Sequence, residues 1–372
     1  YGVFNPRQFP VNSKPSLEQA RAALDRLSSL LDGFEFKSPS DFAASLSAIL
    51  TATVRTSLST APGFLATAHV FGSGKSFLLS IIAMFATPDQ PASTTFVTDD
   101  DEMRKQLIST LMESPPVILF DEMTGDLIPV KCLLAALTAE RIEGRILGVS
   151  KMARPSTRTL MLFAGNNVQA MQDMTRRVLT IRLDPQCETP AAREFKTDPL
   201  QQIRAKRGDY IADALTVISA WQGAGCPKAD VRPLNGFSQW AEWCRQPLLW
   251  LGMTDPCETL FEQMGEDPDR ELLSRLLRTW NSCFRTTPCM VRDLVKRAND
   301  VADLHDALIE IAGYRDDIDR RRLGRWLKNH TGRIVDGMRL ERDTTFRRNS
   351  ECWRLTLFSE RQKSSDHTDH TD

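Results

Sequence analysis

The chain has 372 residues, of which 41% are hydrophobic and 26% are charged, and its formal net charge is -1. This composition is typical of a globular protein, and the length predicts two or three domains. Because the net charge is close to zero, no long-range field attracts a polyanion. Any binding of nucleic acid must therefore come from a local cluster of cations.

The sequence argues against a membrane-spanning protein and against a fold held together by zinc or disulfides. No apolar run reaches the roughly 18 residues of a membrane span, and the best candidate is residues 77–86. The eight cysteines include no C-x-x-C pair, which argues against a zinc site or a disulfide framework. We therefore expect reduced thiols, a cytoplasmic location and no membrane partner. Because the chain begins with Tyr1 rather than Met, we also expect a further domain upstream.

The first half of the chain changes from helical periodicity to an alternation of strands and helices. Apolar residues recur at helical spacing over 17–31 and 40–55, which predicts an N-terminal helical collar within residues 1–58. Apolar runs typical of buried strands then follow at 61–70, 94–98, 117–120, 159–164 and 178–183. Helical segments separate most of these runs, so we expect a mostly parallel sheet, covered by helices, over residues 59–190.

The second half is mainly helical. Helical periodicity over 197–284 predicts a helical lid that occupies residues 191–284. From residue 288 onward, three helical segments precede "RIVDGMRLER" and "ECWRLTLF", which predict a β-hairpin. Three helices and a hairpin are typical of a winged helix, which we place at residues 285–360. The polar, repetitive segment 361–372 is expected to be a disordered tail.

The stretch "ATAHVFGSGKS" resembles a phosphate-binding loop between a strand and a helix. Glycines let the backbone approach a phosphate, and the free N–H groups of a helix N-terminus attract the anion. Lys75 would reach the β- and γ-phosphates and Ser76 would bind Mg²⁺. His69 stands where the general pattern has its first glycine. The expected ATP-binding residues are Gly72, Ser73, Gly74, Lys75, Ser76 and Phe77.

A second motif, "PPVILFDEMTG", is an apolar strand that ends in two acidic residues, as in a Walker B element. Asp121 would bind Mg²⁺, and Glu122 would orient or polarise the attacking water. The motif follows Lys75 by about 45 residues, a distance that suits a neighbouring strand of the same sheet. The alternative is an exposed acidic pair after a strand.

Two further motifs complete this order. In "TLMLFAGNN", Asn166 is our preferred sensor of the γ-phosphate or the lytic water, with Asn167 as the alternative. In "MTRRVLTIRLD", Arg177, and next Arg176, would meet the ATP of a neighbouring subunit and neutralise the developing charge. The alternative is a surface ion pair. Arg207, like Arg204, is a weaker candidate for a second sensor that reaches back to the nucleotide.

Together these motifs resemble the AAA+ ATPases. The stretches "RILGVSKMARPSTRTLMLFAGNN" and "WAEWCRQPLLWLGMTDP" are similar to the superfamily 3-like helicases of phages, plasmids and integrated elements. Such ATPases are often the C-terminal part of primase-helicase replication proteins. The resemblance implies an α/β fold with an AAA+ P-loop core, a hexameric ring, ATP with Mg²⁺ bound between subunits, and motion along DNA.

Two basic segments are candidates for DNA binding. "GRILGVSKMARPSTRT" could form a β-hairpin that carries Lys151, Arg154 and Arg158, and rings of this type place such a hairpin in the central pore. Residues 313–363 contain 14 Lys and Arg against 8 Asp and Glu, and Arg321, Arg325 and Lys328 share one helical face. The alternatives are a solvated basic turn and a protein-interaction surface.

The sequence therefore predicts an ATP-dependent DNA helicase or translocase that acts in replication of a phage or mobile element. The alternative is a DNA-binding initiator, regulator or loader that uses ATP for assembly and does not unwind DNA.

Overall fold

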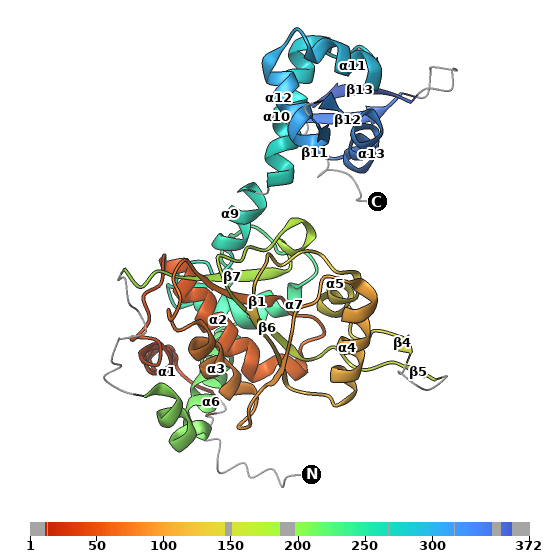
Figure 1. The fold of residues 1–372 in the computed structure, drawn as a ribbon. Coiled ribbons are helices and arrows are strands. Elements are labelled where there is room, and N and C mark those ends of the chain that lie inside the picture. The colour runs from red at the N-terminus through yellow and green to blue at the C-terminus, as the bar shows by residue number, and fades with distance from the viewer. Residues whose placement is uncertain are drawn as a thin grey trace, which may run out of the picture. The chain divides into compact units, whose positions relative to one another are not determined.

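The computed structural model describes residues 12, 14–145, 151–186, 198–266, 268–315, 317–343 and 351–358. The chain divides into two compact units, Tyr1–Met264 and Gly265–Asp372 (Figure 1). The tip of the predicted hairpin at 146–150 and the predicted tail at 361–372 lie outside the described residues.

The N-terminal unit is built on a parallel sheet of five strands in the order β2-β3-β6-β1-β7. The strands are β1 (Gly63–Ala68), β2 (Ala92–Thr94), β3 (Val117–Met123), β6 (Leu160–Asn166) and β7 (Val178–Leu183). Parallel strands buried on both faces are near-continuous apolar runs, and β6 is buried from Leu160 to Gly165. The predicted α/β class with a parallel sheet is confirmed.

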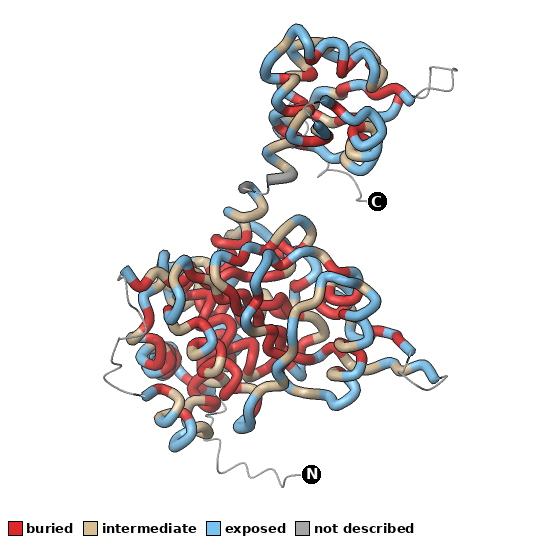
Figure 2. The backbone as a smooth tube through the Cα atoms, in the orientation of Figure 1, coloured by how far each residue is buried: buried red, intermediate tan, exposed pale blue. Residues whose placement is uncertain are grey.

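Helices cover both faces of this sheet. The helices of this unit are α1 (Leu17–Ser29), α2 (Pro39–Val54), η2 (Arg55–Ser57), α3 (Lys75–Ala86), α4 (Asp100–Met112), α5 (Lys131–Thr138), η3 (Gln172–Met174), α6 (Pro199–Gly223), α7 (Ser238–Trp240), η5 (Ala241–Arg245), α8 (Gln246–Trp250) and α9 (Glu258–Glu266). Apolar residues of α1, α2, α3 and α6 form one core with alternate strand residues such as Phe64 and Leu162. The intervening strand residues, such as Leu65 and Phe163, pack with α4 and α5 on the opposite face. Figure 2 colours much of the sheet and of the helices packed on it as buried.

The expected N-terminal collar is part of this unit. Ala23, Leu24 and Leu27 of α1 and most of α2 are buried in the same core as the sheet. Ser38 caps α2 by accepting a hydrogen bond from the Asp41 N–H, and the Asp41 carboxylate in turn accepts from Arg182 on β7 at 3.0 Å. This ion pair joins α2 directly to the edge strand of the sheet.

The C-terminal unit has its own core. Its helices are α10 (Pro268–Phe284), α11 (Val291–Ala298), α12 (Ala302–Ala312) and α13 (Arg320–His330), and its strands are β8 (Cys289–Met290), β9 (Gly313–Tyr314), β10 (Asp317–Ile318), β11 (Ile334–Val335), β12 (Met338–Arg342) and β13 (Cys352–Leu357). The antiparallel order β11-β12-β13-β8 contains the expected pairing of β12 with β13. Leu273, Leu277 and Trp280 of α10 are buried in this core. Thus α10 belongs to this unit, whereas the sequence placed it in the lid.

Candidate functional site

The loop between β1 and α3 lies at the carboxyl end of an interior strand. The chain leaves β1 for β2 at one edge of the sheet and later returns to β7 at the other edge. Ligands of open parallel sheets bind at the carboxyl ends of the strands, next to such a change of direction. The residues predicted from the motifs after β1, β3 and β6 therefore lie at one end of the sheet.

The backbone conformation of this loop depends on two glycines. Gly72 and Gly74 have backbone φ angles of 70° and 89°, which residues other than glycine rarely adopt. A Cβ atom on Gly74 would lie 3.2 Å from the ring of Phe34, so the loop also packs too closely there for a larger residue. Gly74 precedes the first turn of α3, whose N–H groups have no partner within the helix. The predicted contribution of Phe77 is limited to its backbone N–H, since its ring packs against Phe34.

Lys75 is held inside the loop. Its Nζ donates to Ser73 Oγ at 3.0 Å and to Asn166 Oδ1 at 2.6 Å. Burial lowers the pKa of Lys75, and the charge of Asp121 opposes that shift. The structure thus brings together the predicted lysine and the preferred sensor asparagine, although they are 91 residues apart.

Ser76 and Asp121 form a pair that suits Mg²⁺. Ser76 Oγ donates to Asp121 Oδ1 at 3.0 Å. Two oxygens bound at right angles to one Mg²⁺ ion lie about 3 Å apart, and Mg²⁺ typically takes only one or two protein ligands beside phosphates and waters. Within the described residues, no group of three or more His, Cys, Asp or Glu side chains could hold a metal ion. The separation of these two oxygens fits a magnesium ion that takes its other ligands from outside the protein.

A bulge displaces the acidic pair from the sheet. The register of β3 with β6 shifts between Phe120 and Met123, and Glu122 has a left-handed φ of 54°. Such a conformation costs a non-glycine residue about 1 kcal/mol or more and is concentrated at functional sites. The bulge leaves Asp121 half-buried beside Ser76 and exposes Glu122 to solvent. Glu122 is thus accessible to a water molecule.

The sequence did not identify the contact that His69 makes. His69 Nδ1–H donates to Asn167 Oδ1 at 2.8 Å, next to the bond between Lys75 and Asn166. The only signal was the unexpected histidine in a glycine position, and its partner could not be identified from spacing. The structure gives both asparagines a contact to the same loop.

The predicted arginines lie at the other end of the sheet. Arg176 and Arg177 precede β7, and Asp173 accepts hydrogen bonds from both, at 2.5 Å and 2.7 Å. Burial alone would raise the pKa of Asp173, but these bonds and charges outweigh it and lower the pKa. The side chain of Arg176 is 56% exposed and that of Arg177 only 13%. Neither arginine joins the loop of its own chain, and Arg176 is the more accessible one.

The structure does not bring Arg207 to the loop. Its guanidinium donates to the carbonyl oxygens of Met84 at 2.7 Å and Phe85 at 3.3 Å. These carbonyls lie in the last turn of α3, whereas the loop precedes the first turn. Arg207 therefore stabilises the C-terminus of α3 by satisfying its unpaired carbonyls.

A two-stranded hairpin carries the first set of predicted DNA-binding residues. β4 (Gly144–Arg145) pairs in antiparallel register with β5 (Met152–Ala153), next to the exposed Lys151. Arg154 forms an ion pair with Glu143 at 2.5 Å and remains 71% exposed. Arg158 lies at the base of the hairpin, where it pairs with Glu140 at 3.0 Å and donates to the Thr56 carbonyl. Of the three predicted residues, Lys151 and Arg154 are thus nearer in the sequence to the undescribed segment 146–150 than Arg158 is.

The second set lines an open groove of about 580 Å³ along α13. The cations that line it are Arg292, Arg320, Arg321, Arg325 and Lys328. The carboxylate that lines it, Glu351, is already paired with Arg342 at 2.9 Å. Within the described part of the chain, no ion-pair partner faces Arg321, Arg325 or Lys328. The groove is therefore an exposed cationic surface with a partly apolar floor that includes Trp353.

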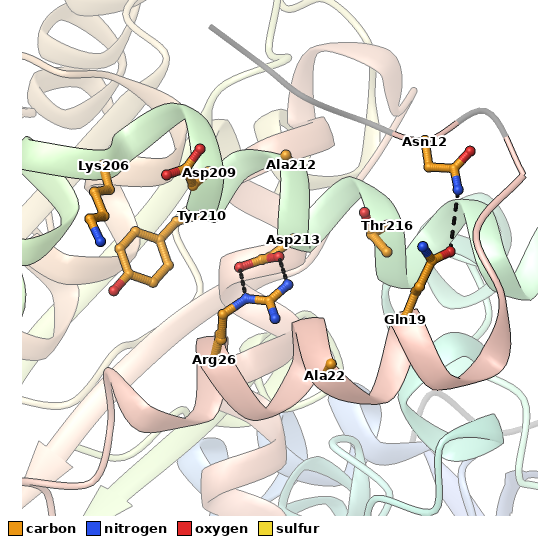
Figure 3. Close-up of a pocket in the computed structure, with 10 residues that line it drawn as sticks. All are labelled: Asn12, Gln19, Ala22, Arg26, Lys206, Asp209, Tyr210, Ala212, Asp213 and Thr216. Atoms are coloured by element: carbon orange, nitrogen blue, oxygen red, sulfur yellow. Dashed lines mark hydrogen bonds and ion pairs between the residues drawn. The ribbon is translucent and has the colours of Figure 1, made fainter.

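A separate pocket of about 540 Å³ lies between α1 and α6 (Figure 3). At its centre Arg26 forms a bidentate pair with Asp213, with Nε donating at 2.9 Å. The hydrogen bond that Arg26 donates to Asp213 raises the pKa of Arg26. Because the central cation is already neutralised and no motif residue lines the pocket, we assign no ligand to it.

The comparisons with known proteins give no family. No family model matches the chain, and no curated protein matches it. Among solved structures, an A-form apo structure of the NrS-1 C-terminal region is similar, with 11% identity and a TM-score of 0.41, covering 95% of this chain and 78% of that one. A second structure of that region has 10% identity, a TM-score of 0.39 and the same coverage, 95% and 78%. No described helix is both long enough and apolar enough to span a membrane.

Proposed function

We propose that this chain is an ATPase of the AAA+ type that couples hydrolysis to movement along DNA in replication of a phage or mobile element. The observation that carries the proposal is the convergence of Lys75, Ser76, Asp121 and Asn166 at the carboxyl ends of three adjacent strands. An isolated glycine-rich turn would not explain why these four side chains bond to one another in pairs.

Each residue has a distinct role in this proposal. The backbone N–H groups of residues 72–77 and the side chain of Lys75 would hold the phosphates. The side chains of Ser76 and Asp121 would hold Mg²⁺. Mg²⁺–ATP supplies a γ-phosphoryl group whose transfer to water places charge on its oxygens. Glu122 would orient the water. The amide N–H groups of Asn166, which its bond with Lys75 does not use, would donate to an oxygen acceptor.

Hydrolysis requires a second copy of the chain in this proposal. Arg176 and Arg177 lie at the amino end of β7, away from the loop of their own chain. Arg176 is then available to the loop of a neighbouring copy, which is the arrangement of a ring. We propose a hexamer in which the exposed Lys151 and Arg154 contact the DNA backbone in the pore.

The test is hydrolysis measured with and without single-stranded DNA. We expect Lys75→Ala to lose nucleotide binding, and Glu122→Gln to keep binding while hydrolysis falls at least about hundredfold, since only the orientation of water is lost. Glu102→Gln, a change to an exposed glutamate on α4, is the matched control. Hydrolysis that is unchanged in both site variants would exclude the motor.

The C-terminal unit supports DNA binding independently of hydrolysis. We propose that it is a winged helix and that α13 contacts DNA phosphates with Arg321, Arg325 and Lys328. Each lost phosphate contact reduces the slope of log affinity against log salt by about 0.9. Changing Arg321, Arg325 and Lys328 together to alanine should therefore reduce this slope by up to about three times 0.9. Lys151→Ala should reduce it by about 0.9. Arg275→Ala, which removes a cation paired with Glu310, is the control and should leave the slope unchanged.

The cationic groove along α13 also favours a second candidate function, a DNA-bound initiator, regulator or loader that uses ATP for assembly. A forked-duplex assay separates the two. Unwinding supports the helicase, whereas DNA-stimulated hydrolysis without unwinding supports the loader.

A further inference from the structure

The last residue of β6 and the residue after it hold both ends of the loop between β1 and α3. Asn166 Oδ1 accepts from Lys75 Nζ at 2.6 Å, at the end of the loop where α3 begins. Asn167 Oδ1 accepts from His69 Nδ1–H at 2.8 Å, at the end where β1 stops. The Asn167 backbone N–H adds a bond to the Ala68 carbonyl at 3.0 Å. One dipeptide thus fixes both ends of the loop.

Backbone conformation explains how adjacent side chains contact the same loop. Successive side chains of a strand project to opposite faces. Asn167 leaves the strand with a left-handed φ of 53°, a conformation that asparagine tolerates better than most residues. The dipeptide is also firmly seated, because a Cβ atom on the preceding Gly165 would lie 2.8 Å from the Met123 carbonyl of β3. Asn167 is therefore a fixed support for the loop.

A bound nucleotide would break the hydrogen bond between Lys75 and Asn166 but not the one between His69 and Asn167. Lys75 must leave Asn166 if it is to reach a phosphate. His69 and Asn167 are both exposed at the surface and bond to each other without using any group that the proposed chemistry needs. The bond between His69 and Asn167 can therefore persist while the other bond exchanges.

We propose that His69 is a positioning residue that tethers the nucleotide loop to Asn167 and so raises the affinity for nucleotide. The inference rests on the proposed ATP site. It reverses the expectation from the general motif, in which a glycine at this position is the favourable residue. Glycine would remove the tether and add conformational freedom that binding must then restrict.

The expected effect is on binding rather than on the chemical step. A single side-chain hydrogen bond corresponds to roughly a three- to tenfold change in an equilibrium constant. His69→Gly should therefore weaken binding of a fluorescent ATP analogue by about three- to tenfold, with little change in hydrolysis at saturating ATP. His69→Gln, which keeps an N–H donor, should restore most of the affinity. His305→Ala, which removes an exposed histidine of the C-terminal unit, is the control.

A second measurement needs no nucleotide. Hydrogen exchange at the loop amides of 70–74 in the free protein should be faster in His69→Gly and slow again in His69→Gln. A double-mutant cycle with His69→Ala and Asn167→Gly, which preserves the positive φ, should show that the second change adds little to the first. Nucleotide affinity in His69→Gly that equals or exceeds wild type, or unchanged loop exchange, would overturn the tether. If wild-type protein binds no nucleotide, the proposed function fails, and the exchange data still decide on the tether.

Discussion

At the scale of single residues, two adjacent arginines have different surroundings. Arg177 is largely buried, with its guanidinium bonded to the carboxylate and the carbonyl of Asp173. Arg176 shares only the carboxylate and is 56% exposed. The sequence favoured Arg177 as the residue that reaches a neighbouring ATP, but exposure favours Arg176, since a group that is fixed within its own chain cannot reach another copy.

Alanine substitutions of the two arginines are therefore predicted to have different effects, one on hydrolysis and the other on stability. Arg176→Ala should reduce hydrolysis about thousandfold and leave the melting temperature nearly unchanged, as expected of an exposed side chain. Arg177→Ala should lower the free energy of unfolding by about 1–3 kcal/mol, because it removes bonds to a partly buried carboxylate. Thermal melting and a phosphate-release assay measure the two effects.

Mixing experiments test whether Arg176 acts on a neighbouring copy. Arg176→Ala and Lys75→Ala are each expected to be inactive. Assemblies that contain both should regain some hydrolysis, because an intact loop then meets an intact arginine at a fraction of the interfaces. No recovery, or full activity of Arg176→Ala alone, would contradict the arrangement.

At the scale of elements, the apolar runs predicted the strands that are buried on both faces. The predicted run 178–183 coincides with β7, and 159–164 overlaps most of β6. The edge strand β2 is different, since the predicted run 94–98 meets it only at Thr94. Its residues are partly exposed, so no continuous apolar run marks it.

Some parts of the candidate site could not be predicted from the sequence. The proximity in space of Lys75, Ser76 and Asp121 was predictable, because the carboxyl ends of parallel strands lie together at one edge of the sheet. The contact between His69 and Asn167 depends on one backbone angle after β6, which no sequence period reports. The position of Arg207 depends on where α6 crosses α3, which periodicity does not determine.

A turn in the C-terminal unit shows how one residue joins two elements. Asp336 and Gly337 connect β11 to β12 with φ angles of 50° and 72°, as in the tight hairpin turns that prefer Asp-Gly. The Asp336 carboxylate accepts hydrogen bonds from Ser274 at 2.5 Å and Arg278 at 2.6 Å, both on α10. These bonds, with the charges of Arg278 and Arg270, lower the pKa of Asp336.

This carboxylate makes the stability of the C-terminal unit depend on pH. Because the pKa is lower in the folded than in the unfolded chain, the contribution is complete above the unfolded value of about 3.9 and is lost as the pH falls through the folded value. Asp336→Asn should therefore lower the melting temperature at pH 7, and the difference from wild type should shrink as the pH falls below the unfolded value of about 3.9 and through the lower folded value. A difference that stays constant between pH 7 and pH 3 would show that the charge is not involved.

At the scale of the whole molecule, each unit has its own apolar core. One core of the N-terminal unit includes Leu260 near its end, and the core of the C-terminal unit begins at Leu273 on α10. The sequence placed the boundary after this helix because residues 197–284 are mainly of helical periodicity. Periodicity reports that a helix forms, but not which core buries it.

Separate cores predict two thermal transitions that respond to different ligands. A ligand that binds only the folded state at a hundred times its Kd stabilises it by about 2.7 kcal/mol, or roughly 5–10 °C for a unit of this size. A non-hydrolysable ATP analogue with Mg²⁺ should therefore raise only the transition of the N-terminal unit in calorimetry. Asp336→Asn identifies the other transition, since it should lower that one alone. A single cooperative transition, or an equal shift of both by nucleotide, would mean that the two cores do not unfold independently and that ATP binding is transmitted through the whole chain.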